Sequence, residues 1–208
     1  MFTREEMNQI LDETDDKGHV AFSREICERL LVDEPNNVYL LAIYANVLTG
    51  FSLYTDALRA IDHAEQIAPP DALKWVLSKK GTLYQKMGDF QKAESIFMQA
   101  YTLDPTEAGL LVFAASAAFV SGNIQRAMEL ATQATHCTSG PIDEAYFNLG
   151  GYLLVQKRYE EARNCYKRAL EIDPNYKIAK TKLEDVEQVL EFVRTEQSEK
   201  FLRLHINP

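Results

Sequence analysis

The sequence predicts an all-α protein in which one helix pair is repeated along most of the chain. Apolar residues recur at the spacing of amphipathic helices, and short turns containing Gly, Asn or Pro separate the helical stretches. The same order of small and large apolar residues returns at a near-constant interval. Because a single helix pair cannot bury its apolar face alone, a repeated pair predicts a stack in which each pair covers its neighbour.

The clearest copy of the pair covers Glu144–Pro174. Gly150 and Ala162 are the small residues that let two antiparallel helices approach closely. Larger side chains at helical spacing fill the seam beside them, namely Leu149, Leu153 and Tyr166. Lys157–Tyr159 form the turn between the two helices, and Asp173–Pro174 disfavours further helix.

Four more copies precede it in register. The first positions of all five copies give steps of 34, 36, 34 and 35 residues, and they are Arg4, Val38, Lys74, Ala108 and Asp143. The first copy is eroded, and the alanine-rich fourth copy carries Ser139 where the others end in Pro. A chance match to one pair would not recur at this period, so the repeat predicts about five helix pairs.

The spacing of the clearest copy resembles that of the tetratricopeptide repeat (TPR), a helix–turn–helix unit of about 34 residues. The matching positions are Tyr146, Leu149, Gly150, Leu153, Ala162, Tyr166, Ala169 and Pro174. The resemblance implies a right-handed TPR superhelix, an α-solenoid, as a single domain over residues 1–208. Its expected parts are a degenerate repeat at 4–37, repeats at 38–73, 74–107, 108–142 and 143–176, and a capping helix with tail at 177–203.

Capping and turn residues place the individual helices. Thr3 and Glu6 form a capping box at the start of a short first helix, Thr3–Glu13. Turns near Gly50, Gly88 and Gly122 separate the two helices of three pairs. The other expected helices are Val20–Val32, Val38–Gly50, Tyr54–Ile67, Ala72–Met87, Phe90–Leu103, Glu107–Ser121, Ile124–His136, Glu144–Gln156 and Tyr159–Ile172.

From Tyr176 the pattern changes to a single amphipathic helix. Its apolar stripe faces the last repeat and consists of Ile178, Leu183, Val186, Leu190 and Val193. Glu184 stands where a paired helix needs a small residue, so this helix is expected to cap the stack, with a turn near Gln197. The tail beyond it is apolar, with Phe201, Leu202, Leu204 and Ile206. Either its last helical turn folds back on the cap, or the tail docks on a second copy in a homodimer.

Composition and charge narrow the classes of partner. The formal net charge of −9 speaks against nucleic acid, whose phosphates require a basic surface. No stretch approaches the roughly 20 apolar residues of a membrane-spanning helix. Met1–Glu6 is already acidic, which is atypical of a secretory signal, so a cytoplasmic protein is expected. Cys27 and Cys165 occupy inward positions and are expected to be buried, whereas Cys137 near a helix end is expected to be exposed.

No arrangement of residues predicts catalysis, a metal site or a cofactor. The four histidines are scattered, and the sequence has no second ligand pair at zinc spacing. The acidic run Asp12–Gly18 fails the EF-hand pattern, because Lys17 stands where the turn needs glycine and Ser23 replaces the bidentate glutamate. Phosphate-binding loops and nucleophile elbows are absent from the sequence. The sequence therefore predicts a non-enzymatic protein without a cofactor.

The resemblance also implies which side chains line a concave groove. In a TPR stack the first helix of each pair lines the groove, mainly through its second, fifth, ninth and twelfth repeat positions. The peptide-binding candidates chosen from these positions are Tyr39, Asn46, Trp75, Ser78, Thr82, Gln85, Val112, Phe119, Phe147 and Leu154. Trp and Tyr are enriched in binding hot spots. The alternatives are that these aromatic residues only pack between neighbouring helices, or that the protein's own termini fill the groove.

One TPR subclass holds the C-terminal carboxylate of chaperones in a clamp of Lys, Asn and Arg. Asn46 matches one clamp position, whereas the other four do not match and are held by Ala42, Lys79, Gly109 and Phe113. Shifting the frame by one repeat makes the agreement worse. The sequence therefore predicts that this carboxylate clamp is absent.

The predicted function is a protein–protein interaction scaffold or adaptor that binds a peptide segment of another polypeptide in its groove. One alternative is a chaperone for a secreted or membrane-inserting partner, because TPR-type chaperones of bacterial type III secretion are similarly acidic and clamp-free, although shorter. A second alternative is a structural subunit that self-assembles through its apolar C-terminal tail. The sequence does not name the partner.

Overall fold

A computed structural model gives the fold and describes residues 20–205, with side chains described for residues 20–196. Over this range the chain is all-α, without a β-strand and with one isolated backbone bridge between Glu107 and Ser139. The prediction of an all-α solenoid of helix pairs with a final capping helix is confirmed for the described part. The expected first helix, Thr3–Glu13, and the acidic run Asp12–Gly18 lie outside the described residues.

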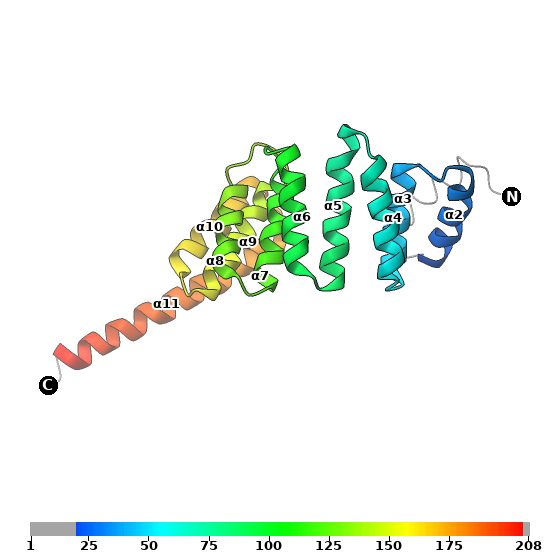
Figure 1. Cartoon of the computed structure of the whole chain (residues 1–208). Helices are drawn as coiled ribbons and strands as arrows, with labels where there is room; N and C mark the ends of the chain where they lie inside the picture. Colours follow the sequence, from blue (N-terminus) through cyan, green and yellow to red (C-terminus); the bar gives the residue numbers. More distant parts are fainter. Residues whose placement is uncertain (1–19, 206–208) are drawn as a thin grey trace. The chain divides into compact units, whose positions relative to one another are not determined.

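The chain divides into two compact units, Met1–Asp104 and Pro105–Pro208. The helices of the first unit are α2 (Val20–Asp33), α3 (Val38–Gly50), α4 (Tyr54–Ile67), α5 (Pro70–Met87) and α6 (Phe90–Leu103). Those of the second are α7 (Ala108–Val120), α8 (Ile124–Ala134), α9 (Ile142–Val155), α10 (Tyr159–Ile172) and α11 (Lys177–His205) (Figure 1). The expected continuity of a single solenoid across both units stays a prediction.

The helix ends follow the turn chemistry that the sequence indicates. Asn37, Asp89 and Asn123 cap α3, α6 and α8, because the side-chain oxygen of each accepts a hydrogen bond from a backbone N–H in the first turn. Gly88 ends α5 with a φ of 80°, a left-handed conformation that costs glycine little. Helix α5 begins at Pro70, two residues earlier than predicted, since Pro is tolerated in the first turn where its missing N–H has no partner to lose.

Small residues lie at the contact between the two helices of each pair. Ala57, Ala93, Ala127 and Ala162 hold this position in four second helices, and each is 0% exposed, as the repeat pattern predicts. The pattern also predicts the burial of Cys27, which is 0% exposed. The other two thiols differ from expectation: Cys165 and Cys137 are both half-buried.

The glycines of the first helices lie opposite the largest buried rings. A Cβ placed on Gly81 would lie 2.5 Å from the Phe97 ring, and one on Gly150 would lie 2.8 Å from the Tyr166 ring. Both distances are shorter than any real contact of a Cβ. Each ring therefore occupies the space that a side chain on the glycine would need, and the glycine lets the two helices pack at this distance.

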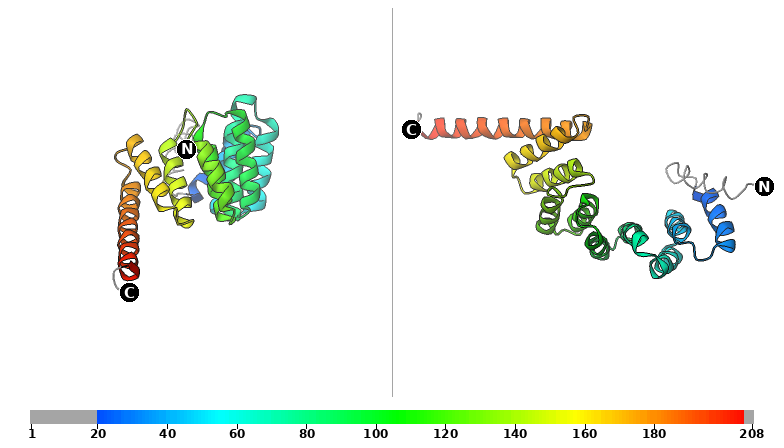
Figure 2. Two further views of the ribbon diagram at one scale, coloured as in Figure 1. Left: turned by 90° about the vertical axis from the view of Figure 1, so that its left-hand side faces the viewer. Right: turned by 90° about the horizontal axis from the view of Figure 1, so that it is seen from above.

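The capping helix α11 runs without a break from Lys177 to His205, so the predicted turn near Gln197 is wrong. Part of its predicted stripe packs on α10, where Val186 is 0% exposed and Leu190 8% exposed. Ile178, a residue of the predicted stripe, is 59% exposed. Figure 2 shows that α11 extends beyond α10 as one helix, which leaves no turn with which the last helical turn could fold back on the cap. The side chains of the apolar tail, Phe201, Leu202, Leu204 and Ile206, lie outside the described ones, so the homodimer stays a prediction.

Gly150 and Gly151 provide a matched pair for testing the helix contact. Replacing Gly150 by Ala should lower the free energy of unfolding by about 1–3 kcal/mol, because the new methyl group meets the buried Tyr166 ring. Replacing Gly151 by Ala should raise it by roughly 0.5–1 kcal/mol, because Ala favours helix and its Cβ has only the Tyr166 hydroxyl nearby, at 3.9 Å. Denaturant titration measures both changes. A Gly150→Ala variant as stable as Gly151→Ala would disprove the contact.

Buried titrating groups predict a loss of stability at alkaline pH. Burial raises the pKa of Tyr152 and Tyr166 from 10.0 to about 12, and that of Cys165 from 9.0 to about 11. The unfolded chain therefore releases these protons at lower pH than the folded chain does, and the free energy of unfolding should fall as the pH rises from about 9 to about 12. Denaturant titrations at pH 8, 10 and 11 measure the fall. Tyr166→Phe should make it shallower, and equal stability at all three values would contradict the expectation.

Candidate functional site

Helices α3 and α5 are the first helices of successive pairs, and they contact each other directly. Six of the predicted groove residues come from these helices: Tyr39, Asn46, Trp75, Ser78, Thr82 and Gln85. Tyr39 and Asn46 are exposed and the other four are half-buried, so all six reach solvent. We call the surface formed by these residues, together with Lys79 and Lys86 of α5, the α3/α5 face.

A stacked pair of aromatic rings lies on the α3/α5 face. Tyr39 and Trp75 hold equivalent positions in successive repeats, so the packing of α3 on α5 brings them together. Their ring centroids lie 4.3 Å apart and their planes differ by 10°. Tyr39 nevertheless remains 60% exposed, and Trp75 is half-buried. The two rings hold each other in place while still offering apolar surface to a ligand.

Two lysines extend this surface along α5. The Lys79 ammonium lies 5.6 Å from the centroid of the Trp75 ring, within reach of a cation–π interaction. The neighbouring Lys80 differs, because its ammonium lies 2.8 Å from Asp62 and 2.5 Å from Glu65 and its side chain is only 13% exposed. Among the described side chains, no carboxylate forms an ion pair with Lys79 or Lys86. The positive charge of both is therefore available to a ligand.

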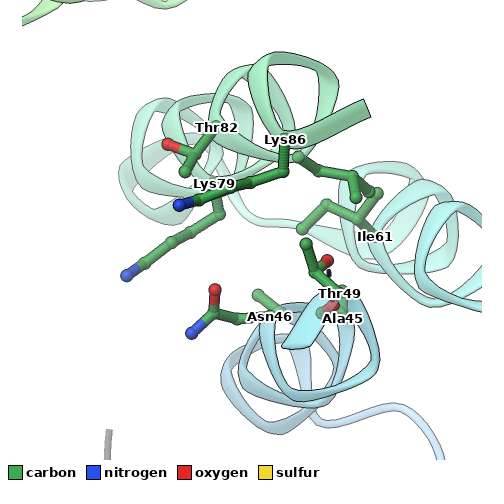
Figure 3. Close-up of a pocket in the computed structure, with 9 residues that line it drawn as sticks. Ala45, Asn46, Thr49, Ile61, Lys79, Thr82 and Lys86 are labelled. Carbon is green, nitrogen blue, oxygen red and sulfur yellow. Dashed lines mark hydrogen bonds between the residues drawn. The ribbon is translucent and has the colours of Figure 1, made fainter. Parts of the chain in front are cut away.

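A small hollow lies between α3 and α5 where these residues meet. Its volume is about 10 Å³, and it is lined by Ala42, Ala45, Asn46, Thr49, Ile61, Lys79, Thr82, Leu83 and Lys86. Figure 3 shows Lys79 and Lys86 leaving α5 in the same direction, on the side of the hollow where the Asn46 carboxamide projects from α3. The hollow thus has an apolar floor and a polar mouth with two positive charges.

Lys79 and Lys86 were not among the groove residues predicted from the sequence. They stand at the sixth and thirteenth positions of their repeat, one residue beyond Ser78 and Gln85. One residue corresponds to a rotation of 100° around the helix, so both lysines lie at the edge of the row formed by Ser78 and Gln85. Two lysines separated by seven residues on a predicted first helix of an acidic chain are the signal that could have revealed them.

In the second unit the predicted aromatic residues pack largely against other rings. Phe119 stacks on Tyr152 with centroids 4.7 Å apart. The centroid of the Phe147 ring lies 5.0 Å from that of Tyr176 and 5.7 Å from that of Tyr166. Phe119 and Phe147 are half-buried, so these two rings have a packing role beside any contact with a ligand.

Val112 and Leu154 complete the predicted set. Leu154 is half-buried, but Val112 is 2% exposed and is a core residue of α7, because that helix is apolar around nearly its whole circumference. Val112 therefore offers no surface to a ligand. The two units are separate bodies here, so the ten candidates do not form one described site: six lie on the α3/α5 face and four in the second unit.

The beginning of α9 is acidic, in contrast to the α3/α5 face. Burial, and to a lesser extent the charge of Asp143, raises the pKa of Glu144. Burial also raises the pKa of Tyr176, and the charges of Glu144 and Asp143 contribute to this increase. The exposed surface near Phe147 thus carries negative charge, while that near Trp75 carries positive charge.

A larger open groove of about 620 Å³ lies between α8 and α10. Its apolar floor consists of Met128, Leu149, Leu153 and Cys165. On its rim, Arg158 donates two hydrogen bonds to Glu161, at 2.7 and 2.6 Å. Burial raises the pKa of Cys165 to about 11, so the thiol is protonated at neutral pH and is a poor nucleophile.

Neither a metal site nor a membrane-spanning helix is found among the described residues. No three His, Cys, Asp or Glu side chains lie together as ligands for a metal ion within that range. In the same part of the chain, no helix combines the length and apolar character that crossing a membrane requires.

Two segments of the chain match family models described as tetratricopeptide repeat, residues 143–176 and residues 76–107. Mouse protein O-mannosyl-transferase TMTC1 is 24% identical over 85% of this chain, which corresponds to 16% of TMTC1. The tetratricopeptide repeat-containing protein trd-1 of Caenorhabditis elegans is 30% identical over 44% of this chain and 11% of its own length. The chain thus spans less than a fifth of the length of either relative.

Solved structures of TPR proteins share the fold. The first TPR of Spaghetti (RPAP3) bound to the HSP90 peptide SRMEEVD is 28% identical, with a TM-score of 0.52 over 57% of this chain and 93% of that one. The TPR protein TTC0263 of Thermus thermophilus is 19% identical, with a TM-score of 0.64 over 89% of this chain and 100% of that one. The C-terminal part of a TPR protein from Cytophaga hutchinsonii is 18% identical and reaches 0.68 over 86% of this chain and 69% of that one. The chain thus contains tetratricopeptide repeats at residues 76–107 and 143–176, and its repeated helix pairs have the fold of solved TPR proteins.

Proposed function

We propose that the protein is an adaptor that binds a peptide segment of another polypeptide on the α3/α5 face. The observation that carries this proposal is the Tyr39–Trp75 stack, which remains exposed although the two rings contact each other. An exposed, preorganised pair of aromatic rings is a suitable anchor for an apolar side chain, because Tyr and Trp bury a large area while losing little conformational freedom.

Polar groups beside the rings can satisfy the backbone of such a peptide. The Thr82 hydroxyl donates to the carbonyl oxygen of Ser78 at 3.1 Å, and its oxygen remains able to accept a hydrogen bond from a peptide N–H. The Asn46 carboxamide is exposed and has both donor and acceptor groups. An extended peptide lying across α3 and α5 would therefore find apolar contacts at one end of the face and hydrogen-bonding groups towards the other.

The comparison with Spaghetti (RPAP3) supports this type of ligand. That TPR is 28% identical to part of this chain and its structure contains an HSP90 peptide with several carboxylates. Here the α3/α5 face carries two lysines without an ion pair in the described part of an otherwise acidic protein. We therefore propose that the bound segment combines an apolar side chain for the rings with negative charge for the lysines.

Replacing Trp75 by Ala tests the anchor. Peptides selected on the wild-type protein from a random 12-residue phage library are synthesised and their dissociation constants measured by isothermal titration calorimetry. Trp75→Ala should weaken binding by about 30-fold or more, equivalent to about 2 kcal/mol for a hot-spot residue. Trp75 is the single Trp of the chain, so ligand binding on this face should also change the intrinsic fluorescence of the wild-type protein.

A matched control is Phe192→Ala on α11, which removes another exposed aromatic side chain, 62% exposed, that belongs to the second unit. It should leave the affinity unchanged. Circular dichroism should show unchanged helix content in both variants. Two results together would contradict the α3/α5 face as the binding site. The peptides would bind Trp75→Ala as tightly as they bind the wild type, and they would leave the Trp fluorescence of the wild type unchanged.

A further inference from the structure

We propose that Asn46, Lys79 and Lys86 bind the phosphate group of a phosphorylated side chain in the peptide held by the α3/α5 face. The inference rests on the function proposed above, and it specifies the chemistry of the ligand. The phosphate lies at the mouth of the hollow between α3 and α5, next to the Tyr39–Trp75 stack. The bound segment would then be selected by one modified residue as well as by its apolar side chain.

The charges around the hollow are the first argument. Both lysines line the hollow and end on the same side of it, and within the described chain neither forms an ion pair with a carboxylate (Figure 3). Lys80, one residue from Lys79, shows the opposite arrangement, with Asp62 and Glu65 on its ammonium. Two positive charges that share one opening repel each other, so an anion placed between them is attracted by both. The site is therefore complementary to negative charge.

The number of charges favours a phosphate. A phosphorylated side chain carries about −1.5 to −2 at neutral pH, which matches two ammonium groups, whereas a single carboxylate neutralises only one. Its oxygens accept several charge-assisted hydrogen bonds at once. Lys79 and Lys86 each have an ammonium to donate, and the carboxamide nitrogen of Asn46 is a third donor on the opposite helix.

The size and floor of the hollow are the second argument. A volume of about 10 Å³ corresponds to one water-sized group, so a single oxygen atom fits inside while the rest of the ligand stays at the mouth. This excludes a ring or a branched side chain from the hollow. The other lining residues are the apolar Ala42, Ala45, Ile61 and Leu83 and the hydroxyl residues Thr49 and Thr82, whose hydroxyls donate to the carbonyl oxygens of Ala45 and Ser78. Asn46, Lys79 and Lys86 therefore supply the donors for a tetrahedral group at the mouth.

Three fluorescein-labelled peptide pools test the proposal. Each pool has four random residues on both sides of a fixed central residue, which is phosphoserine, serine or glutamate. Fluorescence anisotropy gives an apparent dissociation constant for each pool with the full-length protein. The phosphoserine pool should bind at least tenfold more tightly than the serine pool, with the glutamate pool between them. Raising the salt concentration from about 50 to about 500 mM should reduce this preference.

The double variant Lys79→Gln/Lys86→Gln should lose the preference for phosphoserine over serine. The matched control Lys180→Gln/Lys182→Gln, which removes two exposed lysines of α11, should keep the preference. Circular dichroism should show the helix content of the wild type in both double variants. The wild-type protein separates this inference from the proposed function. A wild type that binds no peptide would contradict the proposed function, whereas one that binds the display peptides without preferring phosphoserine would contradict only the phosphate site.

Three results would overturn the phosphate site. The first is equal binding of the phosphoserine and serine pools by the wild-type protein. The second is a preference that survives in Lys79→Gln/Lys86→Gln, which would place the phosphate elsewhere. The third is tighter binding of the peptide SRMEEVD as a free acid than of the phosphoserine pool, with loss of that binding when its C-terminus is amidated. That result would assign the two lysines to a terminal carboxylate instead.

Discussion

The close contact between a helix glycine and a large buried ring is the constraint on which the rest of the structure depends. Gly81 faces Phe97 and Gly150 faces Tyr166, and in both pairs a Cβ on the glycine would overlap the ring. The ring fills the seam and the missing side chain sets the distance between the two helices, so each pair forms one rigid unit. In these two pairs the first helix supplies the glycine and the second helix supplies the ring.

The α3/α5 face arises where the first helices of two successive pairs contact each other. Equivalent repeat positions on neighbouring first helices lie side by side, and Tyr39 and Trp75 stack for this reason. The fold supplies the spacing, but the side chains decide what can bind. Lys79 and Lys86 make this face basic in a chain of net charge −9, whereas Asp143 and Glu144 make the start of α9 acidic. Local charge, and not net charge, therefore determines which partner fits each face.

The far end of the chain is stabilised by a different kind of contact. Helix α11 has no partner helix of its own, so it buries one apolar stripe on α10 and is held at its edges by two ion pairs, Lys167–Glu187 and Arg194–Glu160. Both pairs are exposed and contribute little individually. The buried Val186 and Leu190 provide most of the attachment, because burying an apolar side chain stabilises a contact more than an exposed ion pair does.

The sequence by itself determined the helix pairs, most of their boundaries and the buried small residues, because local turn chemistry and helical periodicity specify them. It also indicated the aromatic candidates Tyr39 and Trp75. Only the tertiary structure decided that Val112 is buried, that α11 continues through Gln197, and that Lys79 and Lys86 share one hollow with Asn46. These outcomes depend on how neighbouring helices rotate and pack. Lys79 and Lys80 are neighbours in the sequence, yet Lys79 lies beside the half-buried Trp75 ring and Lys80 between two carboxylates. A step of 100° around a helix changes which neighbour a side chain meets.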